Sequence, residues 1–296
     1  SDLPAEGGPR AEARRLARLR SPRLQLRPGQ EGSCWFHSQL PEMLDQAMFW
    51  LLGGRVDYAS CRAYKVLHWS LDHSVECGCV APSNPEVFNL SFIEAGAADG
   101  LSLSSTLFFE SQLGWRGLCV EASPEQHRQL SMNRPLCASR LAAIGGGGKS
   151  APSLTFYSFL GGRAWSELQS CLQSAHGPAQ CRGDEAARAF AAAHGAELRI
   201  DEVPVRQLEE LVRSAGISRL ALIVLDIEGA ELAALRSMDF GSTPTRFLAV
   251  EGNSTAVRHH LARAGFETFP APPLAVAAGL PVIPQLDTWF AREEDA

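Results

Sequence analysis

Long hydrophobic runs are absent from this sequence. No apolar stretch approaches the roughly 18 residues that a membrane-spanning helix needs, so we predict no membrane span. A surplus of positive charge is also missing, because 33 acidic residues outnumber 27 basic ones and leave a net charge of −6. This balance argues against nucleic acid as the main partner. With 45% hydrophobic and 20% charged residues, the chain still has enough apolar material for a globular core.

Three common ligand-binding motifs are missing as well. No Gly-x-Gly-x-x-Gly follows a strand-like run, which disfavours a nicotinamide dinucleotide. Residues 145–150 (Gly-Gly-Gly-Gly-Lys-Ser) resemble a phosphate loop, but Pro152 and a strand-like run follow where such a loop needs a helix. Cys77 and Cys79 are too close in sequence for the usual zinc spacing, and no second pair matches them. Dinucleotides, nucleoside triphosphates and structural zinc are therefore disfavoured.

The eight cysteines are an even number, as is usual in proteins with disulfides. Cys171 and Cys181 bracket a loop and are expected to pair. Cys61 is expected to pair with one of the two cysteines of segment 77–79. Cys119 lies inside an apolar, strand-like run, so we expect a buried free thiol there.

Two sequons for N-glycosylation begin at Asn89 (Asn-Leu-Ser) and Asn253 (Asn-Ser-Thr). Together with the cysteines, they favour the lumen of the endoplasmic reticulum or Golgi, or secretion. The cytoplasm is the alternative compartment.

The composition divides the chain into three parts. Residues 1–30 are rich in Arg, Pro and Gly and are expected to form a flexible basic arm. Residues 31–90 form a Cys-containing extension, whose segment 55–88 we expect to be irregular and to pack on the main domain as a lid or flank. Residues 91–296 form the main domain, which an insertion interrupts at about residues 145–202.

Strand-like and helix-like segments alternate from residue 91 onward, which is typical of a parallel sheet covered by helices on both faces. We therefore predict an α/β fold with a mostly parallel, seven-stranded sheet, closed by a late antiparallel strand. The expected strands cover residues 91–96, 117–122, 140–144, 219–226, 246–251, 266–269 and 287–291, with one more at 154–159 in the insertion. The expected helices cover residues 104–113, 124–133, 184–194, 206–215, 229–237 and 255–264, with one more at 40–52 in the extension.

Acidic and small residues gather where the predicted strands end. In open α/β sheets, ligands lie beyond the carboxyl ends of the strands. Glycines there let a ligand approach the backbone closely, and an acid about twenty residues after the first turn suits a ribose. Glu231 opens the following helix, where it either caps the helix or serves the site. The residues at the strand ends are Glu94, Gly96, Asp99, Gly100, Glu121, Asp226, Glu228, Glu251 and Asn253.

Three segments carry a family resemblance. They are 92–100 (Phe-Ile-Glu-Ala-Gly-Ala-Ala-Asp-Gly), 107–124, which holds Cys-Val-Glu-Ala-Ser-Pro, and 224–232 (Val-Leu-Asp-Ile-Glu-Gly-Ala-Glu-Leu). In combination they resemble the FkbM-type family of S-adenosylmethionine-dependent methyltransferases, over roughly residues 90–290. Glu94 departs from the Asp that is common in the first motif, and Ala97-Ala98 stand where a bulkier Asn is frequent.

The resemblance implies a Rossmann-like class I methyltransferase fold and S-adenosyl-L-methionine as the cofactor. The first turn would line the methionine end, Glu121 would hold the ribose, residues around Ala143 would flank the adenine, and Asp226 would lie near the reactive methyl group. The cofactor-binding residues expected in this way are Glu94, Gly96, Ala98, Asp99, Gly100, Glu121, Ala122, Ala143 and Asp226.

The family's typical reaction is O-methylation of a hydroxyl group. Such a hydroxyl is a poor nucleophile, so a general base or a metal ion would assist. We expect Asp226, Glu251 and His259 to be catalytic. Asp226, Glu251 and Asn253 resemble the ligand set of metal-dependent catechol-type methyltransferases, which suggests a divalent cation, Mg²⁺ or Mn²⁺.

The sequence thus predicts an O-methyltransferase that acts on a glycan or a small hydroxylated acceptor. The alternative is a methyltransferase-like binding or trafficking protein that kept the fold and lost turnover.

Overall fold

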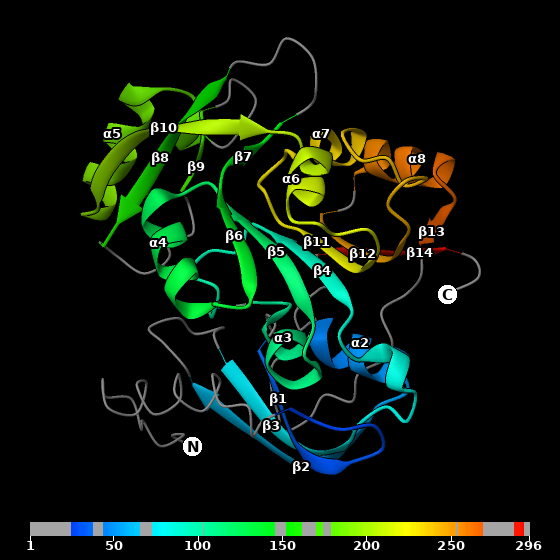
Figure 1. Ribbon diagram of the computed structural model, residues 1–296. Coiled ribbons are helices and arrows are strands. Elements are labelled where there is room, and N and C mark those ends of the chain that lie inside the picture. Colours follow the sequence, from blue (N-terminus) through cyan, green and yellow to red (C-terminus); the bar gives the residue numbers. More distant parts are fainter. Residues whose placement is uncertain are drawn as a thin grey trace.

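The computed structural model describes residues 25–37, 44–65, 73–102, 104–145, 152–161, 170–173, 179–252, 254–268 and 287–292. The predictions for most of the basic arm, for Asn253 and for the phosphate-loop-like run from residue 146 lie outside these residues. The described elements form three sheets and the helices that cover them (Figure 1). The α/β class is therefore confirmed.

The largest sheet has seven strands in the order β13-β14-β12-β11-β4-β5-β6. β12, β11, β4, β5 and β6 run parallel, and β14 is antiparallel to β12, as expected for the late strand. All six residues of β11 are buried, in agreement with its continuous apolar run. The strands are β4 (Ser91–Ala95), β5 (Arg116–Glu121), β6 (Cys137–Leu141), β11 (Leu220–Leu225), β12 (Thr245–Glu251), β13 (Phe266–Thr268) and β14 (Asp287–Arg292).

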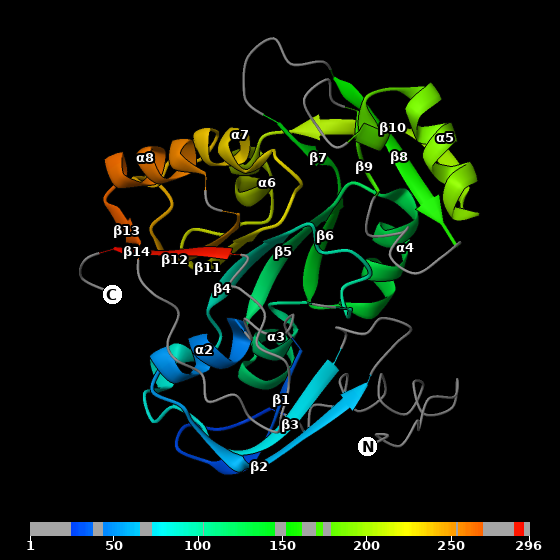
Figure 2. The ribbon, with the colours of Figure 1, turned by 180° about the vertical axis from the view of Figure 1, so that it is seen from behind.

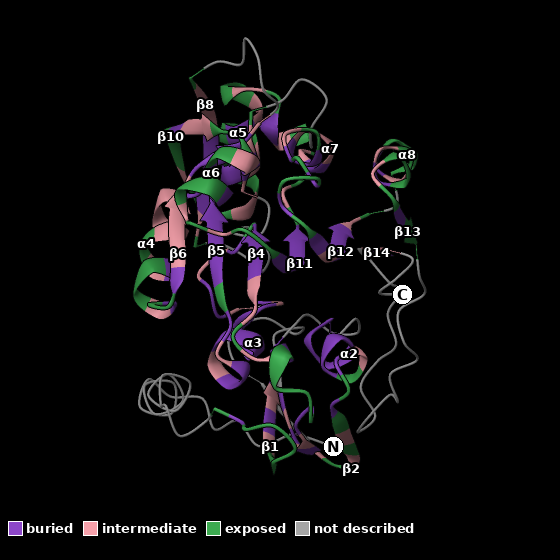
Figure 3. Ribbon diagram, turned by 45° about the vertical axis from the view of Figure 1, so that its right-hand side comes forward, coloured by how far each residue is buried: buried purple, intermediate pink, exposed green. Residues whose placement is uncertain are grey.

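Alternate residues of the strands point to opposite faces of this sheet, and each face has its own core. Ile93, Ile223 and Leu248 pack under α6 (Leu208–Ser214), α7 (Glu231–Arg236) and α8 (Thr255–Arg263). The opposite face packs against α3 (Leu107–Leu113) and the amino-terminal extension (Figure 3). α4 (Pro124–Asn133) connects β5 to β6. Of the described helices, none combines the length and the apolar character that crossing a membrane requires.

The amino-terminal extension is more regular than expected. Residues 55–88 were expected to be irregular, but they hold two long strands, β2 (Arg55–Lys65) and β3 (His73–Val80), which join β1 (Glu31–Phe36) in an antiparallel sheet. Buried Val75, Cys77 and Cys79 alternate with less buried residues along β3, but cysteine is not among the residues typical of strands, so the sequence signal was weak. The helix α2 (Leu44–Leu51), between β1 and β2, brings Phe49 against Phe108 of α3, and the extension thereby completes one core of the main sheet.

The insertion and the residues that flank it form a four-stranded sheet with the order β7-β10-β8-β9, and the described part of the insertion includes the helix α5 (Asp184–His194) (Figure 2). Its strands are β7 (Ala143–Ile144), β8 (Ser153–Leu160), β9 (Cys171–Leu172) and β10 (Glu197–Arg206).

One expectation about this region was wrong, and one strand was missed. The single strand expected over 140–144 is divided between β6 of the main sheet and β7 of the inserted sheet. β10 was not predicted, because it is largely exposed, carries charges on both faces and contains Pro204. A pattern based on apolar periodicity has little signal in such a strand.

All eight cysteines form disulfides, and these confirm some pairings and correct another. Cys171 bonds to Cys181 as expected, and Cys61 bonds to Cys77, one of its two candidate partners. A third disulfide joins Cys34 to Cys79. The free thiol expected at Cys119 was wrong, since it bonds to Cys137 across the neighbouring strands β5 and β6, with the two Cα atoms 6.0 Å apart. That partner follows from strand register, which the sequence alone did not give.

Candidate functional site

The order of the strands identifies a topological switch point in the main sheet. From β4 the chain proceeds outward through β5 to β6, and later from β11 to β12 on the other side. The direction of strand order therefore reverses between β4 and β11. Ligands of open α/β sheets bind outside the carboxyl ends of the strands at such a reversal. The segments that follow β4 and β11 are thus the candidate site.

These two segments touch at Gly96. The amide of Asp226, directly after β11, donates to the carbonyl of Ala95 at 3.0 Å. A Cβ atom on Gly96 would lie 1.8 Å from the carbonyl oxygen of Asp226, and the φ of Gly96 is +82°. Glycine is therefore required here for both space and conformation.

The turn after β4 is held by hydrogen bonds to β5 and by hydrogen bonds within the turn. The amides of Gly96 and Ala97 both donate to the carbonyl of Val120 on β5. The carboxylate of Asp99 accepts from the amides of Leu101 and Ser102 at 2.9 and 2.7 Å. The predicted cofactor residue Asp99 thus shapes the turn with its side chain.

Ala98 lies in this turn with a φ of +46°, a backbone conformation that residues other than glycine seldom adopt. Its amide donates to Glu121 Oε2 at 2.8 Å, which joins the turn to the end of β5.

Glu121 lies where the sequence predicted an acid for a ribose. Its other oxygen, Oε1, accepts from the amide of Ser123 at 2.7 Å. Burial raises the pKa of this carboxyl, while the hydrogen bonds from backbone amides act in the opposite direction. A carboxylate has about four lone-pair positions, and the backbone amides of Ala98, Ala122 and Ser123 bond to this one, so the group keeps capacity for a further hydrogen bond.

Glu94 is the expected site residue within β4, and its carboxylate faces the interior of the protein. Its oxygens accept hydrogen bonds from the hydroxyls of Ser104 and Thr106 and from the amide of Ser105. It also pairs with buried Arg134. Glu94 therefore supports the turn from behind, and its direct contact with a cofactor stays a prediction.

The adenine side of the expected site is apolar. Ala143, on β7, is buried against Phe156 and Val203 of the inserted sheet, and Ala122 packs on the same cluster. The insertion therefore comes close to the end of β5.

Three carboxylates gather beyond β11 and β12. Asp226, Glu228 and Glu251 can bring one oxygen each within 4.8 Å of the others. Glu228 was noted in the sequence as an acid at a strand end but was not assigned a catalytic or metal-binding role. Its φ of +54° turns the backbone sharply after β11, which the following glycine in Asp-Ile-Glu-Gly could have signalled.

The environment of Glu228 changes its acidity. Partial burial, together with the charges of Glu251 and Glu231, raises the pKa of Glu228 to about 7. Glu231 accepts from the amides of Ile227 and Gly229, so it caps the turn before α7. Of its two expected roles, capping is the one for which contacts are present.

The last expected catalytic residue, His259, is exposed on α8. Among the described residues, the group of potential metal ligands holds the three acids and does not include this histidine. Its role in catalysis remains a prediction.

Comparison with known proteins gives one family. The family model described as "Methyltransferase FkbM domain" matches residues 94–267, which is more than half of the chain. A solved structure of methyltransferase FkbM from Methylobacillus flagellatus KT is 12% identical, with a TM-score of 0.37. The match covers 69% of this chain and 43% of that one, so this chain spans less than half of its length. No curated protein matches at a significant level.

The contact between the two strand ends predicts that Gly96→Ala is severely destabilising. Gly216 is the matched control, because its φ of +69° is similar but nothing lies within 4 Å of its Cβ position. Gly216→Ala should cost about 1–2 kcal/mol from conformation alone, and Gly96→Ala clearly more because the carbonyl of Asp226 must move. Urea denaturation of both variants measures the difference. If both variants lose the same free energy of unfolding, the two strand ends are not in close contact.

The raised pKa of Glu228 predicts a pH-dependent stability. Because this carboxyl keeps its proton to about pH 7 when folded, compared with its ordinary value of 4.5, folding takes up a proton between these values, and stability falls as pH rises through this window. The Glu228→Gln variant lacks the carboxyl and therefore lacks this fall in stability. The stability of the variant relative to the wild type should rise from pH 4.5 to above pH 7. Thermal unfolding in the presence of a chelator measures the effect, with Glu86→Gln as the control. A difference that does not change with pH would contradict the assignment.

Proposed function

The chain belongs to the FkbM methyltransferase family, and on that premise we propose that it transfers a methyl group from S-adenosyl-L-methionine to a hydroxyl oxygen. The acceptor is a glycan or a small hydroxylated molecule. The proposal includes a class I methyltransferase fold for residues 91–296. The observation that carries it is the glycine turn, which lies at the reversal of strand order and is bonded to the acid that ends β5.

The donor would lie over the turn at residues 96–100. Gly96 is exposed and Ala98 is partly exposed, and both have positive φ angles and little or no side chain, so a ligand could approach the backbone here closely. Glu121 would accept hydrogen bonds from the ribose hydroxyls through its remaining lone pairs. Ala122 and Ala143 would supply the apolar surface near the adenine.

The acidic group Asp226, Glu228 and Glu251 would serve the acceptor. S-adenosylmethionine supplies the methyl group on a positively charged sulfur atom. The hydroxyl oxygen forms the new bond to this carbon as the carbon–sulfur bond breaks, and the hydroxyl proton must leave. A carboxyl group whose pKa is about 7 is suited to accept that proton at neutral pH. In this scheme the residues of the chain mainly orient the two reactants.

The same group also fits a divalent cation. Its ligand atoms are carboxylate oxygens that can lie within 4.8 Å of one another, and such oxygens are the usual ligands of Mg²⁺ and Mn²⁺. The ion would hold the acceptor oxygen and lower the pKa of its hydroxyl. Asp226 and Glu251 are the proposed ligands, with Asn253 as the third.

The proposed compartment is the secretory lumen or the outside of the cell. Four disulfides are typical of an oxidising environment. Asn89 of the first sequon is exposed in the loop before β4 and is the proposed glycosylation site. A loss of mass when secreted protein is treated with a glycosidase tests the assignment, and an unchanged mass would contradict it.

One observation favours the alternative of a binding protein without turnover. The carboxylates of Glu94 and Glu121 already accept hydrogen bonds from groups of the chain itself. A measurement of donor binding distinguishes the two candidate functions. A protein that lost both turnover and its cofactor site would not bind S-adenosylmethionine.

We expect calorimetry to detect binding of S-adenosylmethionine and Glu121→Ala to weaken it. Hydrogen bonds to charged groups contribute about 1.5–3 kcal/mol, so the dissociation constant should rise about 10- to 100-fold. Glu125→Ala on the neighbouring α4 is the matched control and should bind like the wild type. An unchanged affinity of the Glu121 variant would exclude the proposed ribose contact, and a wild type that does not bind would favour the alternative.

Removal of metal tests the proposed cation. Protein treated with EDTA and then dialysed should lose methyl transfer to a responsive acceptor from a glycan or metabolite screen, and Mg²⁺ or Mn²⁺ should restore it. Asp226→Asn should raise the metal concentration needed for half-maximal activity. Full activity after chelation would contradict the metal site.

A further inference from the structure

A buried arginine lies directly behind the glycine turn. Arg134 follows α4, and its side chain is fully buried. It pairs with two carboxylates, Glu110 at 2.7 Å through Nε and Glu94 at 3.3 Å through Nη1. Removing one member of such a buried group leaves charges without compensation, which is costly. The arginine is therefore fixed in place by its charge partners.

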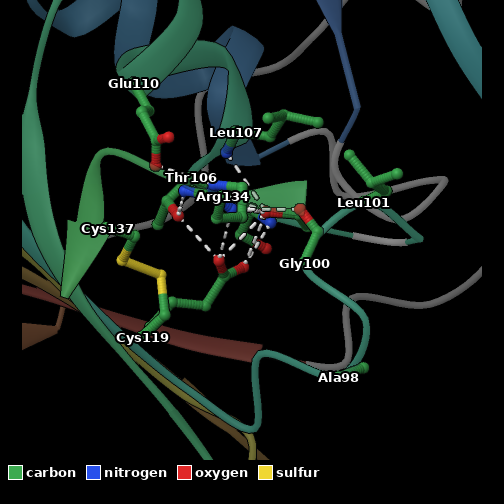
Figure 4. Close-up of polar contacts among 12 residues, drawn as sticks. Ala98, Gly100, Leu101, Thr106, Leu107, Glu110, Cys119, Arg134 and Cys137 are labelled. Carbon is green, nitrogen blue, oxygen red and sulfur yellow. Dashed lines mark hydrogen bonds and ion pairs between the residues drawn. A yellow bond between two sulfur atoms is a disulfide. The ribbon is translucent and has the colours of Figure 1, made fainter. Parts of the chain in front are cut away.

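The remaining donors of Arg134 hold the turn itself (Figure 4). Nη1 donates to the carbonyl of Gly100 at 3.2 Å and to Ser104 Oγ at 2.9 Å. Nη2 donates to Thr106 Oγ1 at 2.9 Å, and this hydroxyl in turn donates to Glu94. The planar guanidinium presents its donors in a rigid fork, so several points of the segment 94–106 are held in one fixed arrangement.

The packing supports the same connection. A Cβ atom on Gly100 would lie 2.6 Å from Cγ of Arg134, so this glycine makes room for the arginine. The neighbouring Asn133 donates to the carbonyl of Asp99 at 2.9 Å. The end of α4 thus contacts the turn through two successive side chains.

The position of Arg134 along the chain is also restrained. Its carbonyl accepts from the amide of Cys137, whose disulfide leads to Cys119 on β5. Cys119 lies two residues before Glu121. The disulfide therefore connects the arginine that holds the turn to the strand that carries the proposed ribose acid.

The geometry points to Arg134 as a positioning residue for the methyl donor. Arg134 donates to the carbonyl of Gly100 and so holds the turn in place. The position of the turn then sets the distance between the backbone at 96–100 and Glu121. Misplacement by about 1 Å of the groups that orient a reactant can lower the reaction rate about a hundredfold, so the position of this turn matters for the bound donor. This inference rests on the proposed function, because the ligand it concerns is S-adenosylmethionine.

The test is donor affinity in protein that is shown to be folded. Arg134→Lys keeps the positive charge beside Glu94 and Glu110 but loses the fork. Thr106→Val keeps the shape and loses the hydroxyl that bridges Arg134 and Glu94. Arg128→Met, an exposed arginine of the same helix, is the matched control. Leu261→Ala, in the core of the opposite face, controls for general loss of stability.

Calorimetry with S-adenosylmethionine, at a temperature where circular dichroism shows every variant folded, gives the result. We expect Arg134→Lys to raise the dissociation constant about tenfold or more, Thr106→Val to raise it by a smaller factor, and both controls to bind like the wild type. Wild-type affinity in folded Arg134→Lys overturns the inference. If that variant does not fold, wild-type affinity in Thr106→Val overturns it.

Two other outcomes also count against the inference. An affinity that falls equally in Leu261→Ala would mean that loss of stability alone accounts for the effect. A wild type that does not bind S-adenosylmethionine overturns the proposed function as well, so failure of the function is distinguishable from failure of the inference alone.

Discussion

The close approach of the β4 and β11 ends at Gly96 is the constraint on which the rest of the site depends. The carbonyl of Asp226 occupies the space where any other residue at position 96 would place its Cβ atom. Because the strands are in contact there, the turn after β4 must bend away with positive φ angles. That bend presents backbone instead of side chains at the point where the order of the strands reverses.

The charged residues around Gly96 fall into two groups that differ in burial. Glu94 and Glu110 are buried with Arg134 and fix the turn from the inside of the protein. Asp226, Glu228 and Glu251 are more exposed and lie together beyond the neighbouring strands. In the proposed function, the first group maintains the geometry of the donor site and the second serves the acceptor or a cation.

The sequence was informative where one physical signal dominated. The buried run of β11 and the alternation of strands and helices predicted the α/β class, because hydrophobic periodicity reports burial directly. The motifs around Gly96 and Asp226 predicted the family, which the family comparison confirms. Strands β2, β3 and β10 were missed, since cysteines or charges occupy positions where apolar residues are usual. Two further contacts join segments that are distant in sequence: the disulfide between Cys119 and Cys137, and the hydrogen bond from Arg134 to the carbonyl of Gly100. Both depend on strand register and packing, which the sequence alone did not give.

A crystal structure with bound S-adenosylhomocysteine tests the central claim most directly, which is that the donor lies beyond the carboxyl ends of β4 and β11. The account predicts the ribose hydroxyls within about 2.5–3.0 Å of the Glu121 carboxylate and the amino-acid end of the ligand over the backbone of residues 96–100. A ligand bound elsewhere on the sheet, or one whose ribose does not contact Glu121, would contradict the account.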